Sequence, residues 1–426
     1  MPMPSVSPIG FSRRILPTVC LVTSMMPGWN RDSSADPPST EVRSSDPAAF
    51  WRRHTIDESL VGADGVRLGD FNNDGRIDIV TGWEESGVVR LYLHPGSDAA
   101  TQPWPALTIG HGDSVEDAFP IDIDGDRQLE VISCHEGKTR QVMLHRLDGN
   151  TMKGIDFQNP NQNATTRWQS QTLHQLAAEQ WMFGHGIRLH DGRQAIVLGS
   201  KGRDASITLL RPTAGTPEPI EQWAPQRLRD AGWIMSLRCI DMDQDGDDDI
   251  VYSDRKGPLR GVGWLEQPDD LSGDTPWNDH TLHRSNHEVM FLQADPNQWF
   301  VATRDGVWLR FDRNDDGTWH IRPFSNPVGV AHGKAIARLD DGRLVMTANT
   351  LDDADPTPAI GIWISDPKHT SWSRLGTTQG AKFDRIECVD IDGDGDQDIL
   401  TCEERFALGV VWYENPQYDR SQQTNR

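Results

Sequence analysis

A nine-residue acidic pattern occurs four times in this chain, each time between two short runs of apolar and β-branched residues. The pattern places acidic or amide side chains at its first, third, fifth and ninth positions and begins at Asp70, Asp122, Asp241 and Asp390. The apolar runs that follow it, such as "IDIVTGW" and "DIVYSDR", have the length and composition of strands. Each copy is therefore predicted to be two antiparallel strands joined by an acidic loop.

Three further segments keep the two strands but have a tight turn in place of the acidic loop. They begin at Gly186, Val289 and Ala335. An independent marker gives the same total of seven units, because seven tryptophans, 42 to 64 residues apart, each open a short strand-like run: Trp51, Trp104, Trp168, Trp223, Trp277, Trp319 and Trp372. Four short strands repeated at such intervals are typical of a propeller. We therefore predict an all-β fold, a seven-bladed β-propeller.

The order of the units predicts how the ring closes. The first tryptophan run, residues 51–56, precedes the first acidic loop, whereas no such run follows the last unit near Glu414. We expect the N-terminal strand to complete the last blade by pairing with residues 410–414, which removes an open sheet edge. No blade could bury both of its faces alone. Residues 47–416 are therefore predicted to form one domain, followed by a disordered tail at 417–426.

Residues 1–46 differ in composition from the rest of the chain. Arg13 and Arg14 precede the apolar run "ILPTVCLVTSMM", and a tract rich in Ser, Pro and Asp follows it. This order resembles an export signal with a disordered linker, although a cytoplasmic tail with a chance apolar run would look the same. The run is too short to span a bilayer. We expect an exported protein, whether periplasmic, extracellular or on the cell surface, with no stable membrane span.

The acidic loops account for much of the charge of the chain. The formal net charge is −23, from 64 acidic and 41 basic residues, and the four loops hold 18 of the acidic ones. Such acidity argues against nucleic acid as a partner, because phosphate binding requires basic patches. The four cysteines beyond Cys20 lie in strand-like runs without the spacing of a thiolate zinc site. We expect them to be buried free thiols.

The spacing of the acidic loops suits calcium, which takes six to eight oxygen ligands. Side chains 1, 3 and 5 of a tight loop turn inward, and a carboxylate at position 9 can bind through both oxygens. About four structural Ca²⁺ ions are predicted, with the ligands Asp70, Asn72, Asp74, Asp78, Asp122, Asp124, Asp126, Glu130, Asp241, Asp243, Asp245, Asp249, Asp390, Asp392, Asp394 and Asp398. The alternative is a solvated acidic hairpin. It fits best at residues 312–317, "DRNDDG", which lack an acid at position 9.

The loops "DFNNDGRIDIV", "DMDQDGDDDIV" and "DIDGDGDQDIL", together with "GVVWYENP", resemble the FG-GAP/VCBS repeat family of calcium-binding β-propellers. The resemblance covers roughly residues 50 to 416 and implies the propeller fold and the calcium loops. That family includes adhesion proteins, lectin-like modules and polysaccharide lyases. The seven units are also similar to the propeller domain of aldos-2-ulose dehydratases, which implies metal-assisted sugar chemistry, but the cupin domains of those enzymes are missing here.

Function is expected on the face opposite the acidic loops, where propellers commonly bind ligands. The loops predicted for that face mix acids, bases, histidines and tryptophans. The mixture suits a carbohydrate or another small polar or anionic ligand, through tryptophan stacking and charged hydrogen bonds. The predicted ligand-binding residues are Trp83, Glu84, Glu116, Asp117, His135, Glu136, Arg140, Trp181, Lys201, Trp233, Asp254, Lys334, Asp384, Arg385, Glu403 and Glu404. For any one of them, a solvated surface charge remains the simpler interpretation.

Three functions are compatible with this face: carbohydrate binding, a sugar lyase or dehydratase that acts by β-elimination, and a protein-interaction scaffold. In the enzyme, a histidine or lysine would remove a proton while a cation stabilises the enolate. The candidate catalytic residues are His185, His287, His332, Lys382 and Arg255. The three histidines could share a transition metal such as Zn²⁺ with a carboxylate as fourth ligand, or be ordinary structural histidines. No GxSxG, P-loop or HExxH motif occurs.

Overall fold

The computed structural model describes residues 51–149, 167–213, 219–271, 275–324, 326–327, 330, 332–349, 360–375, 380 and 382–416. The export-like segment predicted at residues 1–46 and the tail predicted at 417–426 lie outside these ranges.

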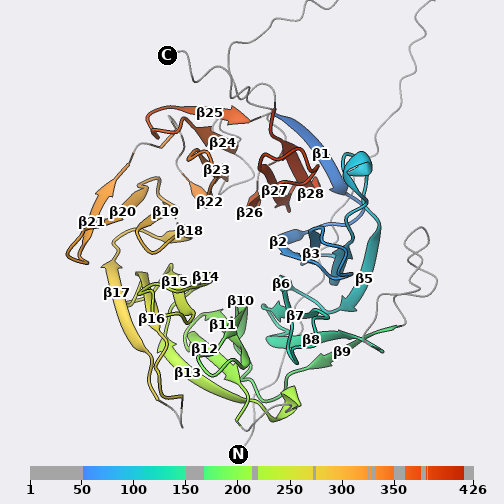
Figure 1. Ribbon diagram of the computed structural model, residues 1–426, viewed down its shortest axis with the longest axis vertical. Coiled ribbons are helices and arrows are strands. Elements are labelled where there is room, and N and C mark those ends of the chain that lie inside the picture. Colours follow the sequence, from blue (N-terminus) through green and yellow to red (C-terminus); the bar gives the residue numbers. More distant parts are fainter. Residues whose placement is uncertain are drawn as a thin grey trace, which may run out of the picture. The chain divides into compact units, whose positions relative to one another are not determined.

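Seven four-stranded antiparallel sheets form a ring, which confirms the predicted seven-bladed β-propeller (Figure 1). The first strand of each sheet is innermost, and the fourth lies at the rim. Blade 1 is β2 (Ala63–Gly69), β3 (Asp78–Trp83), β4 (Val88–Tyr92) and β5 (Ala106–His111); blade 2 is β6 (Val115–Ile121), β7 (Glu130–His135), β8 (Gln141–Leu147) and β9 (Trp168–Thr172); blade 3 is β10 (Gln180–Arg188), β11 (Gln194–Lys201), β12 (Ser206–Arg211) and β13 (Ala224–Asp230).

The remaining blades repeat this order. Blade 4 is β14 (Ile234–Ile240), β15 (Asp249–Asp254), β16 (Gly261–Glu266) and β17 (Asn278–Arg284); blade 5 is β18 (Val289–Ala294), β19 (Gln298–Thr303), β20 (Leu309–Arg313) and β21 (Trp319–Pro323); blade 6 is β22 (Gly333–Arg338), β23 (Leu344–Ala348), β24 (Gly361–Ser365) and β25 (Trp372–Leu375); blade 7 is β26 (Phe383–Val389), β27 (Asp398–Glu403), β28 (Gly409–Glu414) and β1 (Arg52–Asp57).

The N-terminal strand β1 closes the ring, as predicted. It pairs antiparallel with β28 in a register that sets Arg52 opposite Glu414 and Thr55 opposite Val411. His54 Nε2 lies 2.8 Å from a carboxylate oxygen of Glu414 across the same pair. Blade 7 therefore combines segments from the two ends of the described chain, and β1 covers the edge that β28 would otherwise expose.

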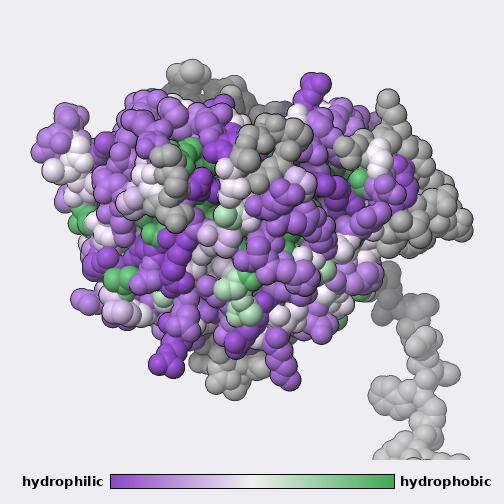
Figure 2. Space-filling view, turned by 90° about the horizontal axis from the view of Figure 1, so that it is seen from below, coloured by the Kyte–Doolittle hydropathy of each residue, from purple (hydrophilic) through white to green (hydrophobic). Residues whose placement is uncertain are grey.

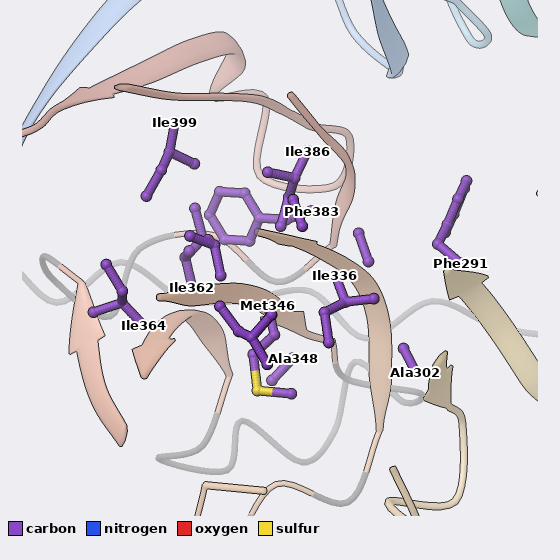
Figure 3. Close-up of a cluster of buried hydrophobic side chains, with 14 of the residues drawn as sticks. Phe291, Ala302, Ile336, Met346, Ala348, Ile362, Ile364, Phe383, Ile386 and Ile399 are labelled. Carbon is purple, nitrogen blue, oxygen red and sulfur yellow. The ribbon is translucent and has the colours of Figure 1, made fainter. Parts of the chain in front are cut away.

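The apolar cores lie where blades face one another. One cluster joins side chains of blades 5, 6 and 7, among them Phe291, Ile336, Met346 and Phe383 (Figure 3). The recurring tryptophan begins the rim strand or lies one or two residues before it, and five of the seven are no more than 6% exposed: Trp51, Trp104, Trp168, Trp223 and Trp277. A blade buries its two faces only between two neighbours, so the repeat length and the tryptophan spacing reflect the same packing unit.

The surface is mainly hydrophilic from the side shown in Figure 2. Among the described residues, the exposed large hydrophobic side chains are those of Val61, Ile77 and Phe406. No helix within those residues is long and apolar enough to cross a membrane. The described cysteines are free thiols, as expected, with Cys134 and Cys402 buried and the other two partly buried.

Candidate functional site

The four acidic loops fold through the same hydrogen bonds. In each, the first carboxylate accepts the backbone N–H of the sixth residue, over 2.9 Å in Asp70–Gly75, 3.1 Å in Asp122–Arg127, 3.2 Å in Asp241–Gly246 and 3.0 Å in Asp390–Gly395. These bonds wrap the loop around its acidic side chains. In two loops they bring three carboxylates so close that one oxygen of each lies within 4.8 Å of the others: Asp122, Asp124 and Asp126, and Asp241, Asp243 and Asp249. Such clusters could hold a metal ion.

The ninth carboxylate of each loop is buried, with exposure between 0% and 2% at Asp78, Glu130, Asp249 and Asp398. One oxygen accepts the N–H of the loop's second residue, as in the 2.9 Å bond from Met242 to Asp249. In three loops the other oxygen accepts an N–H just beyond the third strand, as in the 2.9 Å bond from Gln267 to Asp249. The ninth carboxylate therefore ties the loop to its own blade, and its remaining lone pairs are free for an ion.

The opposite face is organised by a register shift near the start of every inner strand. Such bulges re-aim side chains and occur beside binding sites. The residues at or next to the shifts are, in order of the blades, Asp64, Glu116, Met182, Met235, Met290, Lys334 and Asp384. The mouth of the ring thus has a charged half, from blades 6, 7, 1 and 2, and a methionine half, from blades 3, 4 and 5.

The methionine half is filled by apolar side chains. Met182, Met235 and Met290 are no more than 5% exposed and belong to one apolar cluster. Phe183 of blade 3 and Phe291 of blade 5 pack edge-to-face with ring centroids 5.3 Å apart. Blade 4 separates these two blades, so their contact is made inside the ring. A ligand entering from this face therefore has the charged half as its polar wall.

Buried carboxylates from blades 1, 2 and 7 meet in the charged half. Asp64, Glu84 and Glu116 each place an oxygen within 4.8 Å of the others, and Asp64, Asp384 and Glu404 form a second such group. Asp64 is 2% exposed, Asp384 1% and Glu116 9%. Among the described side chains and backbone groups, we find no hydrogen-bond donor to the carboxylates of Asp64, Glu84 or Glu116. Asp64 and Glu116 are buried and Glu84 is half-buried, and the oxygens of all three are available for a ligand.

Two lysines partly neutralise the cluster. Lys334 contacts Asp384, and Lys382 contacts Glu404. Burial, with the neighbouring carboxylates of Asp64 and Glu136, raises the pKa of Glu84 to about 7 and that of Glu116 well above its usual value. Burial, with the nearby Lys382, lowers the pKa of Lys334 to about 8. Groups whose pKa values are shifted by burial and by specific charged neighbours are typical of functional sites.

Deeper in the ring, Arg67 holds three blades together. Its guanidinium donates to both oxygens of Asp117, over 3.0 and 2.6 Å, and to the carbonyl of Gly184 over 3.1 Å. It borders a cavity of about 390 Å³ whose polar wall includes His185, Arg238, Arg385 and Glu387. Asp117, predicted to contact ligand, is 1% exposed and serves this contact between blades. Arg385, predicted likewise, faces the cavity and pairs with Glu387.

Replacing Asp117 by alanine is expected to cost about 3–5 kcal/mol of unfolding free energy, because it leaves the buried Arg67 charge unpaired. Urea denaturation measures the loss. The matched control is Arg76→Ala, which breaks an ion pair with Asp74 whose arginine side chain is 51% exposed. That control is expected to change stability by less than about 1 kcal/mol. Equal effects of the two substitutions would contradict the assignment.

The histidines predicted to share a metal have separate partners. His185 Nδ1 lies 2.6 Å from the carbonyl of Gly186, His287 Nδ1 lies 2.7 Å from Asp305, and His332 Nδ1 contacts the carbonyl of Arg304. Burial and the guanidinium groups of Arg67, Arg385 and Arg238 lower the pKa of His185 to about 4. Three nearby arginines disfavour a metal cation at His185, so an additional metal has more support at the carboxylates than at the histidines.

Several other predicted ligand contacts are part of the scaffold. Trp83 and Trp181 are 0% and 1% exposed, so their rings offer no face for sugar stacking. His135, Asp254 and Glu403, each 0% exposed, end second strands and bond to the neighbouring loop. These inward-pointing side chains hold the loops of the ligand face in place. Arg140 is exposed and donates to the carbonyl of Gly137.

A basic group lies beside blades 3, 4 and 5. Trp233 has Arg255, Lys256 and Lys201 over its ring, with 4.4, 4.5 and 4.6 Å between their charged centres and the ring centroid. Lys201 contacts Glu136 of blade 2, and Arg255 Nε donates to Glu288 over 2.7 Å. The structure thus places seven of the predicted residues in two neighbouring groups on this face: Glu136, Lys201, Trp233 and Arg255 in the basic group, and Glu84, Glu116 and Lys334 in the carboxylate cluster.

The sequence did not lead us to predict Asp64, the carboxylate that belongs to both groups of three carboxylates in the charged half. A signal was present, because Asp64, Glu116 and Asp384 each stand six residues before the first aspartate of an acidic loop. The residue six before the third acidic loop is Met235, and the residue six before Asp340 of a tight turn is Lys334. Comparing this one position between repeats would have identified the ring of residues at the mouth.

Comparisons with known proteins support the fold and one repeat. Residues 70–133, which include two acidic loops, match the FG-GAP-like repeat. No curated protein is significantly similar in sequence. The solved β-propeller domain of Myceliophteria thermophila Cps50 (Swd1) is 12% identical with a TM-score of 0.51, and covers 84% of this chain and 98% of its own. The WD40 β-propeller domain of Doa1 is 13% identical with a TM-score of 0.48, at 86% and 98% coverage. At such identity the likeness shows only the fold.

Proposed function

We propose that this chain is an exported, calcium-stabilised β-propeller that binds a carbohydrate at the mouth of the ring, opposite the acidic loops. One observation carries the proposal: Asp64 and Glu116 are buried at 2% and 9% exposure without a protein donor among the described residues. The lone pairs of both carboxylates can therefore accept hydrogen bonds from a ligand. Hydroxyl groups of a saccharide would supply the missing donors.

The ion pairs of the two lysines indicate which carboxylates would contact the sugar. Lys334 and Lys382 already compensate Asp384 and Glu404. Within the described part of the chain, no direct ion pair is formed by Asp64, Glu84 or Glu116. Their carboxylates lie close enough together to accept hydrogen bonds from neighbouring hydroxyl groups of one sugar ring. A divalent cation would satisfy the same three groups, so metal content is measured alongside sugar binding.

Calcium in the acidic loops is the structural part of the proposal. The FG-GAP-like match at residues 70–133 and the converging carboxylates support it. The ligand set consists of hard oxygen donors, which calcium prefers. Export rests on Arg13 and Arg14 before the apolar run near the N-terminus.

Replacing Glu84 by glutamine is expected to weaken saccharide binding roughly tenfold, through loss of a charge-assisted hydrogen bond. Asp64→Asn is expected to weaken it at least as much. A glycan array finds the saccharide, and calorimetry measures the affinities. The control is Glu58→Gln, at an exposed position directly after the rim strand β1. A saccharide that binds all three variants as tightly as the unmodified protein would place the site elsewhere.

A sugar lyase or dehydratase is the second candidate, favoured by Lys334. Its pKa of about 8 lets a fraction of the amine act as a base near neutral pH. Lys334 would remove a proton beside a carbonyl or carboxylate, and a protonated Glu116 would donate to the departing hydroxyl as water leaves. New ultraviolet absorbance from an unsaturated product, lost in Lys334→Met, would establish the enzyme. A protein-interaction scaffold has less support, because such interfaces are enriched in apolar and aromatic residues at their centre.

A further inference from the structure

Trp233 has an excess of positive charge around it. Lys201 is compensated by Glu136, and the single carboxylate of Glu288 serves both Arg255 and Arg304, over 2.7 and 3.3 Å. Lys256, half-buried over the same indole, has no carboxylate partner among the described residues. Four cations therefore share two carboxylates. Burial, and to a smaller extent the adjacent Arg255, lower the pKa of Lys256.

The indole and the lysine are held firmly in this arrangement. Asp254 accepts the backbone N–H groups of Gly232 and Trp233 over 3.1 and 2.9 Å, and Arg229 donates to the same carboxylate over 3.1 Å. Gly232 approaches the next loop so closely that a Cβ at this position would lie 1.9 Å from the carbonyl oxygen of Lys256. A surface that is ordered in advance loses less entropy when it binds a ligand.

The basic group adjoins the carboxylate cluster. Glu136, the partner of Lys201, helps raise the pKa of both Glu84 and Glu116, and Lys201 acts on Glu116 in the opposite direction. The mouth is therefore polarised, with hydrogen-bond acceptors over blades 1, 2 and 7 and cations over blades 3, 4 and 5.

We propose that Trp233, Arg255 and Lys256 form a subsite for an anionic group of the ligand, a carboxylate or a sulfate ester. This inference rests on the proposed carbohydrate site and names its substrate class, a sugar acid or a sulfated sugar. Lys256 would supply the uncompensated charge and Arg255 a directed donor, and the indole of Trp233, which both cations cover, would hold them in place. Neutral sugars would lack the ionic contact and bind more weakly.

Calorimetry with glucuronate, glucose 6-sulfate, glucose and inorganic sulfate tests the subsite. Glucuronate or glucose 6-sulfate is expected to bind at least tenfold more tightly than glucose, and the tighter of the two identifies the anion. Lys256→Gln is expected to reduce the preference for the anionic sugar about tenfold and to leave the affinity for glucose unchanged. The control is Lys138→Gln, at an exposed position on blade 2 of the same face.

The outcomes separate this inference from the carbohydrate proposal. Equal affinity for glucose and the anionic sugars, or an anion preference that Lys256→Gln leaves intact, would overturn the subsite while leaving a carbohydrate site in place. Binding of sulfate that depends on Lys256, with no binding of any sugar, would support the subsite and overturn the carbohydrate. Trp233→Phe, which retains an aromatic face, serves as a second variant if Lys256→Gln fails to fold.

Discussion

A variant that lacks residues 1–57 is expected to lose cooperative folding and to aggregate. Those residues include β1, the rim strand of blade 7, together with the buried Trp51 and Ile56, which are 4% and 1% exposed. Removal of one buried tryptophan side chain alone costs about 3–5 kcal/mol. The deletion also breaks the backbone pairing with β28 and exposes that strand as an open edge. The combined loss is comparable with the whole stability of a typical domain, about 5–15 kcal/mol.

The matched control begins at residue 47 and therefore lacks most of the same N-terminal segment but keeps β1. Gel filtration and circular dichroism on both variants isolate the contribution of the strand. A variant without β1 that remains monomeric and melts at the temperature of the control would show that pairing between β1 and β28 does not hold the ring closed.

The architecture was predictable because a propeller repeats one local unit. Each acidic loop lies between consecutive strands, and each tryptophan lies at the start of a rim strand, so spacing along the chain reports the blade directly. The closure of the ring by residues 51–56 was predictable from the order of the acidic loops and the recurring tryptophans along the chain. Local patterns thus determined the number of blades and the face that carries the acidic loops.

The ligand face was predictable only as a set of loops. Whether a residue in those loops reaches solvent depends on the bulge of its strand and on the neighbouring blade. Trp83 and Trp233 illustrate this, because both were predicted to contact ligand, yet one fills the core and the other lies under three cations. The pair Arg67–Asp117 joins residues 50 positions apart, and no local spacing indicates it.

The carboxylates on the two faces of the ring differ in the hydrogen bonds that they accept. On the acidic-loop face, carboxylates accept backbone N–H groups of their own loop, which fixes the loop for a spherical ion. On the other face, Asp64 and Glu116 accept no hydrogen bond from the described chain. In the proposed function, identical residue types would therefore serve the scaffold on one face and recognition on the other.

Removing calcium is expected to lower the unfolding free energy by an amount on the order of 10 kcal/mol, since a site with free ion at 100 times its dissociation constant contributes about 2.7 kcal/mol and four loops share the pattern. Urea denaturation of dialysed protein, with and without added calcium chloride, measures the change. Asp249→Asn is expected to remove about one quarter of it, the share of one loop. The control is Asp316→Asn, in the acidic hairpin without a ninth carboxylate, which is expected to leave the calcium effect unchanged.

The calcium effect is also expected to depend on pH with a definite sign. Without metal, burial and the neighbouring loop carboxylates raise the pKa of Asp78, Asp249 and Asp398 from 3.8 to about 7 in the folded protein. Between these values the folded state holds more protons than the unfolded one, so the calcium-free protein loses stability as the pH rises from 4 to 7. Calcium binds the deprotonated carboxylates and reverses that loss. Added calcium should therefore stabilise the protein much more at neutral pH than in mild acid, and an equal gain under both conditions would argue against metal at the ninth carboxylates.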